Sequence, residues 1–258
     1  MDGSIPPPLA TPKNGSPMSL GARLTNVFTG PGEVFDETIK GPPSTANWLV
    51  PTVLSCVIGV VSVFVVFSQE AIVQPMREKQ AQAVEKRLEK MPKEQRDQAR
   101  EAIEKWSNPE LMKYFAAIGV VARSFGWLFF AALVLWLVGT SVFKGSFTFM
   151  KAVEVCGLAA MISALGVIIT TLLAVVMGNP LATPGPALLI RDLDASNPVH
   201  LMLSALSVVT FWYLSVLSIG LAKLSGASVL KAAVWLFGLW AVITIGLVLL
   251  GAAAQKMF

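Results

Sequence analysis

Hydrophobic residues fill five stretches of this chain almost without interruption by polar side chains. The stretches are Trp48–Phe67, Ser124–Phe143, Val155–Met177, Val199–Ala222 and Ala232–Ala254, and none of them contains Asp, Glu, Lys or Arg. A helix needs about 20 consecutive apolar residues to cross the hydrocarbon core of a bilayer, because its backbone hydrogen bonds are satisfied within the segment. The pattern therefore predicts an all-α fold, a polytopic membrane helical bundle of five transmembrane helices.

The region before the first span divides into two segments. Residues 1–18 are rich in proline and bury too little apolar surface to fold, so we expect a disordered tail. Residues 19–46 carry apolar residues at helical spacing on either side of Gly30-Pro31-Gly32, which predicts two short amphipathic helices. Two interpretations are open for this segment: an interfacial anchor along the lipid headgroups, or packing against the start of the first span. Residues 47–254 then form the membrane domain.

Residues 68–115 differ from the rest of the chain in their charge, with ten Lys or Arg against nine Asp or Glu. Alternating signs and narrow apolar stripes at helical spacing indicate solvated helices, and Pro92 divides them because proline breaks a helix interior. We predict a long extramembrane helical hairpin, with one helix to about Lys90, a second to about Trp106, and a further helix from Pro109 into span two. Its function is open between a docking surface for an extracytoplasmic partner and a hairpin that packs on itself.

Composition agrees with a membrane protein and excludes several other classes. Only 14% of the 258 residues are charged and the mean hydropathy is +0.66, whereas about a quarter of a soluble domain is charged. Soluble enzymes and secreted disulfide scaffolds are therefore disfavoured. Cys56 and Cys156 both lie inside apolar stretches, where they form neither a disulfide framework nor a metal site. The net charge of +4 matches the seven Lys or Arg against three Asp or Glu from Ala116 onward, so it reflects topology rather than nucleic-acid binding.

Basic residues in short loops predict the orientation, because such loops resist translocation. One side holds Lys13, Arg23 and Lys40 in the N-terminal tail, Lys144 and Lys151 between spans two and three, and Lys223 and Lys231 between spans four and five. The other side holds Arg191 and Lys256. We expect a multi-pass protein of a bacterial cytoplasmic membrane, with a cytoplasmic N terminus and an extracytoplasmic C terminus and hairpin.

Candidate catalytic chemistry is sparse. His200 is the only histidine, and Asp192 and Asp194 are near it in sequence, but no nucleophile motif accompanies them. No phosphate-binding or dinucleotide motif is present. We therefore expect no catalytic residues, no metal and no cofactor, and we interpret His200 as an interfacial residue. Arg123 and Glu154 sit just before spans two and three and are interpreted as headgroup anchors rather than gates, on opposite sides of the membrane.

Small and weakly polar residues recur within the spans. Ser204, Ser207, Ser215 and Ser218 are predicted to share one side of span four, and Gly157, Ala160 and Ala164 recur along span three. Such residues allow close helix packing and oligomers through membrane helices, and the alternative is a polar cavity lining.

Several short segments resemble a known family. Residues 27–35, Val-Phe-Thr-Gly-Pro-Gly-Glu-Val-Phe, and residues 47–51, Asn-Trp-Leu-Val-Pro, are similar to the start of bacterial members of the Yip family, the Ypt/Rab-interacting protein domain. Residues 211–213 and 220–226 resemble its penultimate helix and following basic turn. The resemblance covers residues 24–254 and implies five spans and a cytoplasmic N terminus. Eukaryotic relatives act in membrane traffic with small GTPases, but their Asp-Leu-Tyr-Gly-Pro-type motif has no counterpart here, so GTPase binding is not implied.

Two functions remain open. The first is a non-enzymatic membrane protein that acts as a scaffold or organising protein, with the lipid bilayer and other membrane helices as its partners. The alternative is a transporter, channel or lipid-handling subunit. A polar cavity at mid-membrane depth would favour the alternative. A membrane-embedded enzyme ranks third and rests only on His200 with its two neighbouring aspartates.

Overall fold

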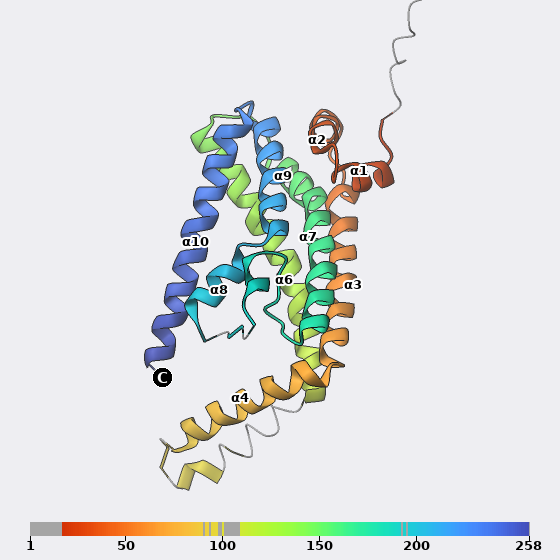
Figure 1. Ribbon diagram of the computed structural model, residues 1–258. Coiled ribbons are helices and arrows are strands. Elements are labelled where there is room, and N and C mark those ends of the chain that lie inside the picture. Colours follow the sequence, from red (N-terminus) through yellow and green to blue (C-terminus); the bar gives the residue numbers. More distant parts are fainter. Residues whose placement is uncertain are drawn as a thin grey trace, which may run out of the picture.

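The structure is a computed structural model, and it describes residues 17–89, 91–92, 94–97, 100, 109–191, 193–194 and 196–257. Five of its helices are long and apolar enough to cross a membrane, which confirms the predicted five-span helical bundle. The helices are α1 (Leu20–Asn26), α2 (Pro31–Lys40), α3 (Ala46–Phe67), α4 (Glu70–Glu89), α6 (Pro109–Leu137), α7 (Phe149–Met177), α8 (Pro198–Ala205), α9 (Val208–Ser225) and α10 (Val229–Met257). A π-helical turn, η1 (Val138–Val142), and a 3₁₀ turn, η2 (Pro186–Leu189), complete them (Figure 1).

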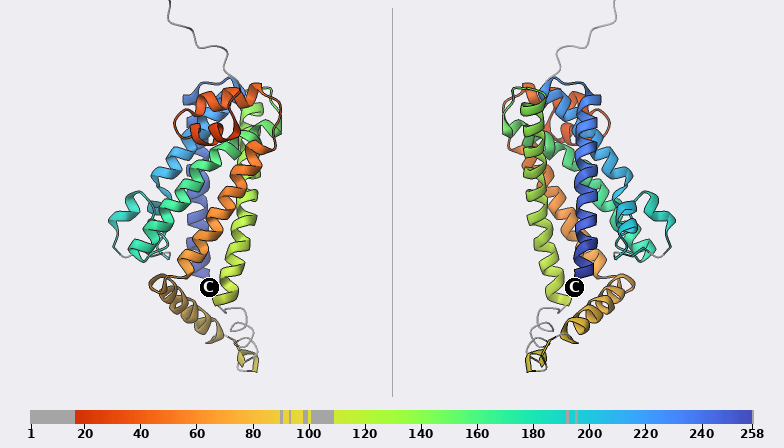
Figure 2. Two further views of the ribbon diagram at one scale, coloured as in Figure 1. Left: turned by 90° about the vertical axis from the view of Figure 1, so that its right-hand side faces the viewer. Right: turned by 90° about the vertical axis from the view of Figure 1, so that its left-hand side faces the viewer.

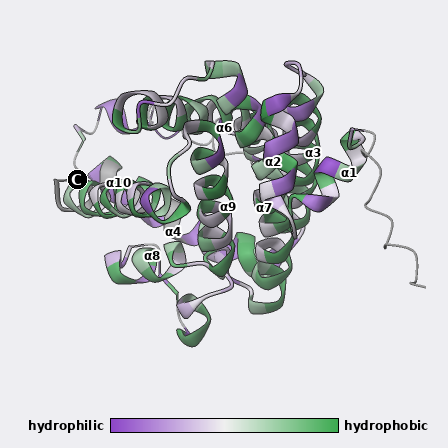
Figure 3. Ribbon diagram, turned by 90° about the horizontal axis from the view of Figure 1, so that it is seen from above, coloured by the Kyte–Doolittle hydropathy of each residue, from purple (hydrophilic) through white to green (hydrophobic). Residues whose placement is uncertain are grey.

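Helix α7 is the central element of the bundle. It packs against α3, α6 and α9, and α10 packs against the far side of α9 (Figures 1 and 2). Half of the most apolar window of α9 is buried, against 6% of that of α10, so α10 is the peripheral span. Helices α1 and α2 lie at one end of the bundle, here named the α2 end, and α4 lies at the other, the α4 end. Viewed from above, hydrophobic residues dominate the spans (Figure 3).

The predicted boundaries of the spans hold for most of the chain. The helix predicted to begin at Pro109 and to run through Arg123 into span two is α6. Span three ends at Met177 as predicted, but it begins six residues before Val155, because the Thr148 side chain accepts a hydrogen bond from Lys151 N and caps the helix at Phe149. This earlier start places Lys151 inside α7 rather than in a loop.

Span four is not the single helix that its hydropathy predicted over Val199–Ala222. Asn197 caps α8 as expected, but α8 ends at Ala205 and α9 starts at Val208. Between them the Ser207 side chain accepts a hydrogen bond from Val209 N, and Val208 N donates to Pro184 O at 2.9 Å. The Ser207 hydroxyl and the Pro184 carbonyl accept hydrogen bonds from the first amides of α9, in place of carbonyls of a preceding helical turn. Ser207 lies in an apolar stretch and Pro184 lies far from it along the chain, so the apolar composition gave no sign of the break.

The break lies deep in the bundle. A Cβ atom on Gly166 would clash with Val209, so α9 begins beside Gly166, eleven residues and about 16 Å before the end of α7. Residues 178–207 occupy the remaining depth towards the α4 end as turns and the short helix α8. Their polar groups bond one another: Thr183 Oγ1 donates to Ser204 O at 2.9 Å, and Ser204 Oγ donates to Leu181 O at 3.2 Å. Irregular backbone at this depth requires such internal bonds.

The charged segment is described only in part. Helix α4 matches the first predicted hairpin helix, residues 94–97 are helical, and Arg100 Nη2 donates to Glu85 at 2.9 and 3.0 Å. Residues 101–108, which include the predicted end at Trp106, lie outside the described residues. The complete hairpin therefore stays a prediction.

A packing test follows from the closest approach between two spans. A Cβ atom on Gly157 of α7 would clash with the backbone of Trp48 in α3, whereas one on Gly246 of α10 meets no atom within 4 Å. Gly157→Ala should lower the free energy of unfolding by about 1–3 kcal/mol, because one of the two helices must shift. Gly246→Ala should leave stability unchanged or raise it slightly through helix propensity. Thermal unfolding in detergent compares the two, and equal melting temperatures would contradict this packing.

Candidate functional site

The N-terminal segment packs onto the α2 end of the bundle. Val27, Val34 and Phe35 are fully buried, and the Phe35 ring lies close to Gly220 of α9, where the missing side chain leaves room for Val155 of α7. Lys223 Nζ donates to Asp36 Oδ2 at 2.5 Å on the outside of this contact. Of the two interpretations of the amphipathic segment, packing against the bundle is therefore observed, and its interfacial role stays a prediction.

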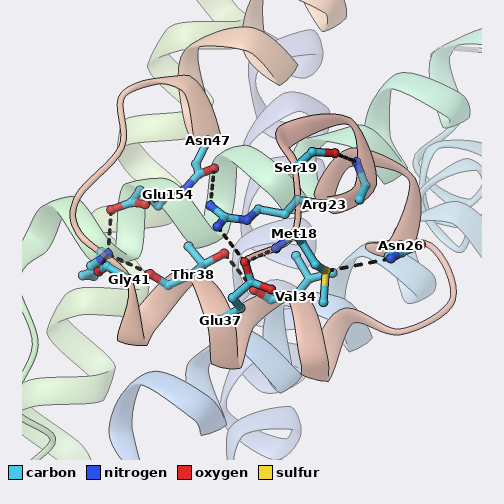
Figure 4. A network of polar contacts seen from close by, with 12 residues as sticks. Met18, Ser19, Arg23, Asn26, Val34, Glu37, Thr38, Gly41, Asn47 and Glu154 are labelled. Carbon is cyan, nitrogen blue, oxygen red and sulfur yellow. Dashed lines mark hydrogen bonds and ion pairs between the residues drawn. The ribbon is translucent and has the colours of Figure 1, made fainter. Parts of the chain in front are cut away.

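A buried ion pair lies beneath α2 (Figure 4). Lys151 Nζ is 3.1 Å from Glu154 Oε1, and the side chain of Glu154 is 1% exposed. The same ammonium group donates to Thr38 O at 2.7 Å and to Gly41 O at 2.9 Å, which are carbonyls at the C-terminal end of α2. A cation is favourable there because the helix dipole is negative at this end. Lys151 thus fixes α2 to α7.

The network extends from Glu154 to α1 and α3. Asn47 Nδ2 donates to Glu154 Oε2 at 2.7 Å, and Arg23 Nη1 donates to Asn47 Oδ1 at 3.1 Å. Arg23 Nη2 also donates to Glu37 Oε1 at 2.8 Å (Figure 4). We name Arg23, Glu37, Asn47, Lys151 and Glu154 the polar clamp. Its two cations and two carboxylates balance, so it joins four helices without a net charge.

The interpretation of Glu154 as a headgroup anchor is wrong. Its carboxylate points into the protein and pairs with a lysine three residues earlier, on the same face of α7. A signal for this was present in the sequence: Thr148 is a good N-cap, and a helix starting there brings Lys151 and Glu154 together. The partners on α2 and α3 are more than 100 residues away and left no local signal.

Two cavities lie between the spans. Cavity one has a volume of about 910 Å³ and lies among α3, α6 and α7, with Thr52, Ser55, Ser62 and Ser124 among its polar lining residues. Cavity two has a volume of about 570 Å³ and lies among α6, α7, α9 and α10, with Thr183, Ser204, Ser207 and Thr210 in its wall. Both volumes fall within the roughly 300–1,000 Å³ of ligand pockets. Most of the other lining residues are aliphatic or aromatic.

Arg123 lines both cavities, so its interpretation as a headgroup anchor is also wrong. It lies within the apolar span Leu111–Val142, twelve residues and about 18 Å after Leu111. The neighbouring Val120 lies against Gly59, in the interior of α3. Among the residues that the structure describes, none forms a hydrogen bond or ion pair with Arg123. The exposed side chain of Arg123 is therefore a charge well inside the second span.

The predicted serine face of span four does not exist as one surface. Ser204 and Ser207 line cavity two, on either side of the break between α8 and α9. Ser215 is exposed and Ser218 is buried, and their hydroxyls donate to Phe211 O and Leu214 O within their own helix. Along α7, Gly157 packs closely against α3, while Ala160 and Ala164 line cavity one.

His200 takes part in a local loop contact. Its Nδ1 accepts a hydrogen bond from Asp194 N at 3.0 Å, which ties the start of α8 to the preceding loop. Asp192 lies outside the described residues. Within the described part of the chain, no group of three or more His, Cys, Asp or Glu side chains is placed to hold a metal ion. Cys56 and Cys156 are both buried as free thiols.

Comparison with known proteins gives one match. A family model described as Yip1 domain matches residues 25–250. This range contains the residues that line the two cavities and every residue of the polar clamp except Arg23. No curated protein and no solved structure matches the chain.

The polar clamp can be tested by removing one of its buried charges. Glu154→Ala leaves Lys151 buried without its carboxylate, which should lower the free energy of unfolding by about 3–5 kcal/mol. Lys223→Ala removes an ion pair whose side chains are 37% and 42% exposed, so it should cost at most about 1 kcal/mol. Thermal unfolding in detergent measures both. Faster trypsin cleavage after the exposed Lys40 should accompany Glu154→Ala only, as α2 detaches, and similar losses in both variants would contradict the clamp.

Proposed function

The chain belongs to the Yip1 domain family, and from this premise we propose that it is a non-enzymatic integral membrane protein that binds lipid between its spans. The observation that supports this most directly is the pair of open cavities between the spans, because a bundle that serves only to pack would fill much of this space with side chains. The same observation favours the lipid-handling alternative over a pure scaffold.

The arrangement of helices supports access from the bilayer. Helices α6 and α10 both line cavity two, yet close contacts between these two helices are few; α9 lies on the inner side of both (Figure 3). Residues of both helices on this side, Phe130 and Leu247, are exposed. A lateral opening towards hydrocarbon admits an acyl chain without its passing through water, and the aliphatic and aromatic residues of the wall provide a surface for it.

The break in span four contributes to the cavity. Because α9 begins only beside Gly166, the space towards the α4 end is left to α8 and the turns before it. Their backbone bonds already satisfy one another, so a ligand there meets mainly side chains. The distribution of Lys and Arg supports a cytoplasmic α2 end. The space between the start of α9 and the α4 end would then lie in the outer leaflet.

Lipid binding is tested by filling cavity two. Thr244→Phe places an aromatic ring in its wall, whereas Val242→Phe on the same helix adds the same ring at a position that is 69% exposed. Native mass spectrometry of protein extracted in mild detergent should find about one lipid per chain in the wild type and in Val242→Phe, and at least a threefold lower occupancy in Thr244→Phe. Equal lipid occupancy in the two variants would exclude cavity two as the binding site.

A scaffold or partner-binding role is the second candidate, and the polar clamp favours it. The clamp holds α1 and α2 in a fixed position on the bundle, so their outer faces form a rigid surface outside the spans. A rigid surface binds a partner without the entropic cost of ordering two short helices.

The scaffold role predicts that partner binding depends on the clamp. Glu37→Ala removes the carboxylate that pairs with Arg23, whereas Glu33→Ala removes an exposed carboxylate of the same helix that takes no part in the clamp. After gentle solubilisation, a stoichiometric partner should copurify with the wild type and with Glu33→Ala, and be lost from Glu37→Ala. Lipid movement across proteoliposomes of pure protein, with no partner bound, would count against this role.

A further inference from the structure

We infer that the lipid held between the spans is anionic, and that its phosphate binds Arg123 where the two cavities meet. This inference rests on the proposed lipid binding and adds the chemical class of the lipid. Lipid binding alone would not require a charged side chain at position 123, so Arg123 is a separate observation.

Charge balance is the first observation. Arg123 is the one charged residue that lines either cavity in the described part of the chain. A cation in the middle of a membrane bundle is costly, and such residues pair with an opposite charge or face a functional cavity. The contrast with Lys151 is direct, because that cation is neutralised by Glu154 and two carbonyls. The exposed side chain of Arg123 therefore faces the cavities without an anionic partner among the described residues.

Depth excludes the usual way of relieving such a charge. Lys and Arg near helix ends extend their side chains to the headgroups. Arg123 lies twelve residues, or about 18 Å, from the nearer end of its apolar span, which is too deep for this. An anion must come to the arginine instead, inside the cavities.

The surroundings of Arg123 match one end of an amphiphile. Arg123, Trp127, Ser163 and Tyr213 line both cavities, so they mark where the two adjoin. The guanidinium donates to two oxygens of one phosphate, and the hydroxyls of Ser163 and Tyr213 are further donors. Away from this point the wall of cavity two is largely apolar, with Leu236, Leu239 and Ile243 of α10. A lipid with its phosphate at Arg123 and an acyl chain along α10 matches both the polar group and the apolar wall.

The start of α9 also faces cavity two, but it does not supply the charge. Val208 N donates to Pro184 O, Val209 N to Ser207 Oγ and Phe211 N to Ser207 O, so these amides are occupied. The recognition of the anion therefore depends on Arg123. A soluble anion would make no use of the apolar wall of cavity two or of the opening between α6 and α10. A lipid uses both for its acyl chains, and the proposed source of the anion is therefore a lipid phosphate.

The experiment titrates purified protein in neutral detergent with three probes and follows the melting temperature. The probes are dioleoyl phosphatidic acid, dioleoylglycerol, which has the same chains without phosphate, and inorganic phosphate. Phosphatidic acid should stabilise the wild type, and the other two should not. In Arg123→Gln the apparent affinity for phosphatidic acid should fall about ten- to a hundredfold, the value of a lost charged hydrogen bond. Arg123→Lys should retain most of the affinity, which keeps the test valid if the glutamine variant folds poorly.

Arg191→Gln is the matched control, because it removes an exposed cation outside both cavities and should leave the titration unchanged. Equal stabilisation by dioleoylglycerol, or an unchanged response in Arg123→Gln, would overturn the inference while leaving lipid binding intact. Stabilisation by inorganic phosphate as strong as that by phosphatidic acid would overturn the lipid as source. The two proposals can fail separately. If Thr244→Phe loses lipid while the wild type binds phosphatidic acid and dioleoylglycerol equally, lipid binding in cavity two stands and only the preference for an anionic lipid is overturned.

Discussion

The hydrocarbon core of a bilayer offers no hydrogen bonds, and the rest of this structure depends on that constraint. Every backbone group at membrane depth must find a partner within the protein. Five long helices meet the requirement internally. In the part of the chain that the structure describes, the turns between α7 and α9 meet it through bonds with one another and with α8, such as those of Thr183 and Ser204. The break in span four is therefore tolerated, and it leaves space that a continuous helix would have filled.

The same constraint separates the charges within the helical bundle into two kinds. Lys151 and Glu154 neutralise each other, and their remaining hydrogen-bonding capacity goes to α2 and to Asn47. They hold the N-terminal helices in place. The side chain of Arg123 is exposed in the bundle and lines two cavities. A paired charge in the protein interior favours a structural role, and an arginine beside open space within a span favours a binding role, because an unpaired charge at membrane depth is costly.

Membership of the Yip1 domain family and the helical architecture agree with each other, since the matched range extends from α1 to α10. The family gives the class of protein. The features that favour lipid binding over a simple scaffold come from the tertiary structure, namely the two cavities and the few contacts between α6 and α10. A clamped pair of N-terminal helices and a lipid-binding bundle are compatible in one molecule, because they lie in different parts of it.

The sequence by itself determined the five spans, the helix start at Pro109 and the cap at Asn197, because hydropathy over about 20 residues and capping chemistry are local properties. It also pointed to the family. Tertiary structure alone decided the break before Ser207, which depends on Pro184. It also decided the partners of Glu154, one of which, Asn47, lies 107 residues away, and the depth of Arg123 relative to its neighbours. These features arise from contacts between distant segments, and a linear pattern of apolar residues carries no record of which segments meet.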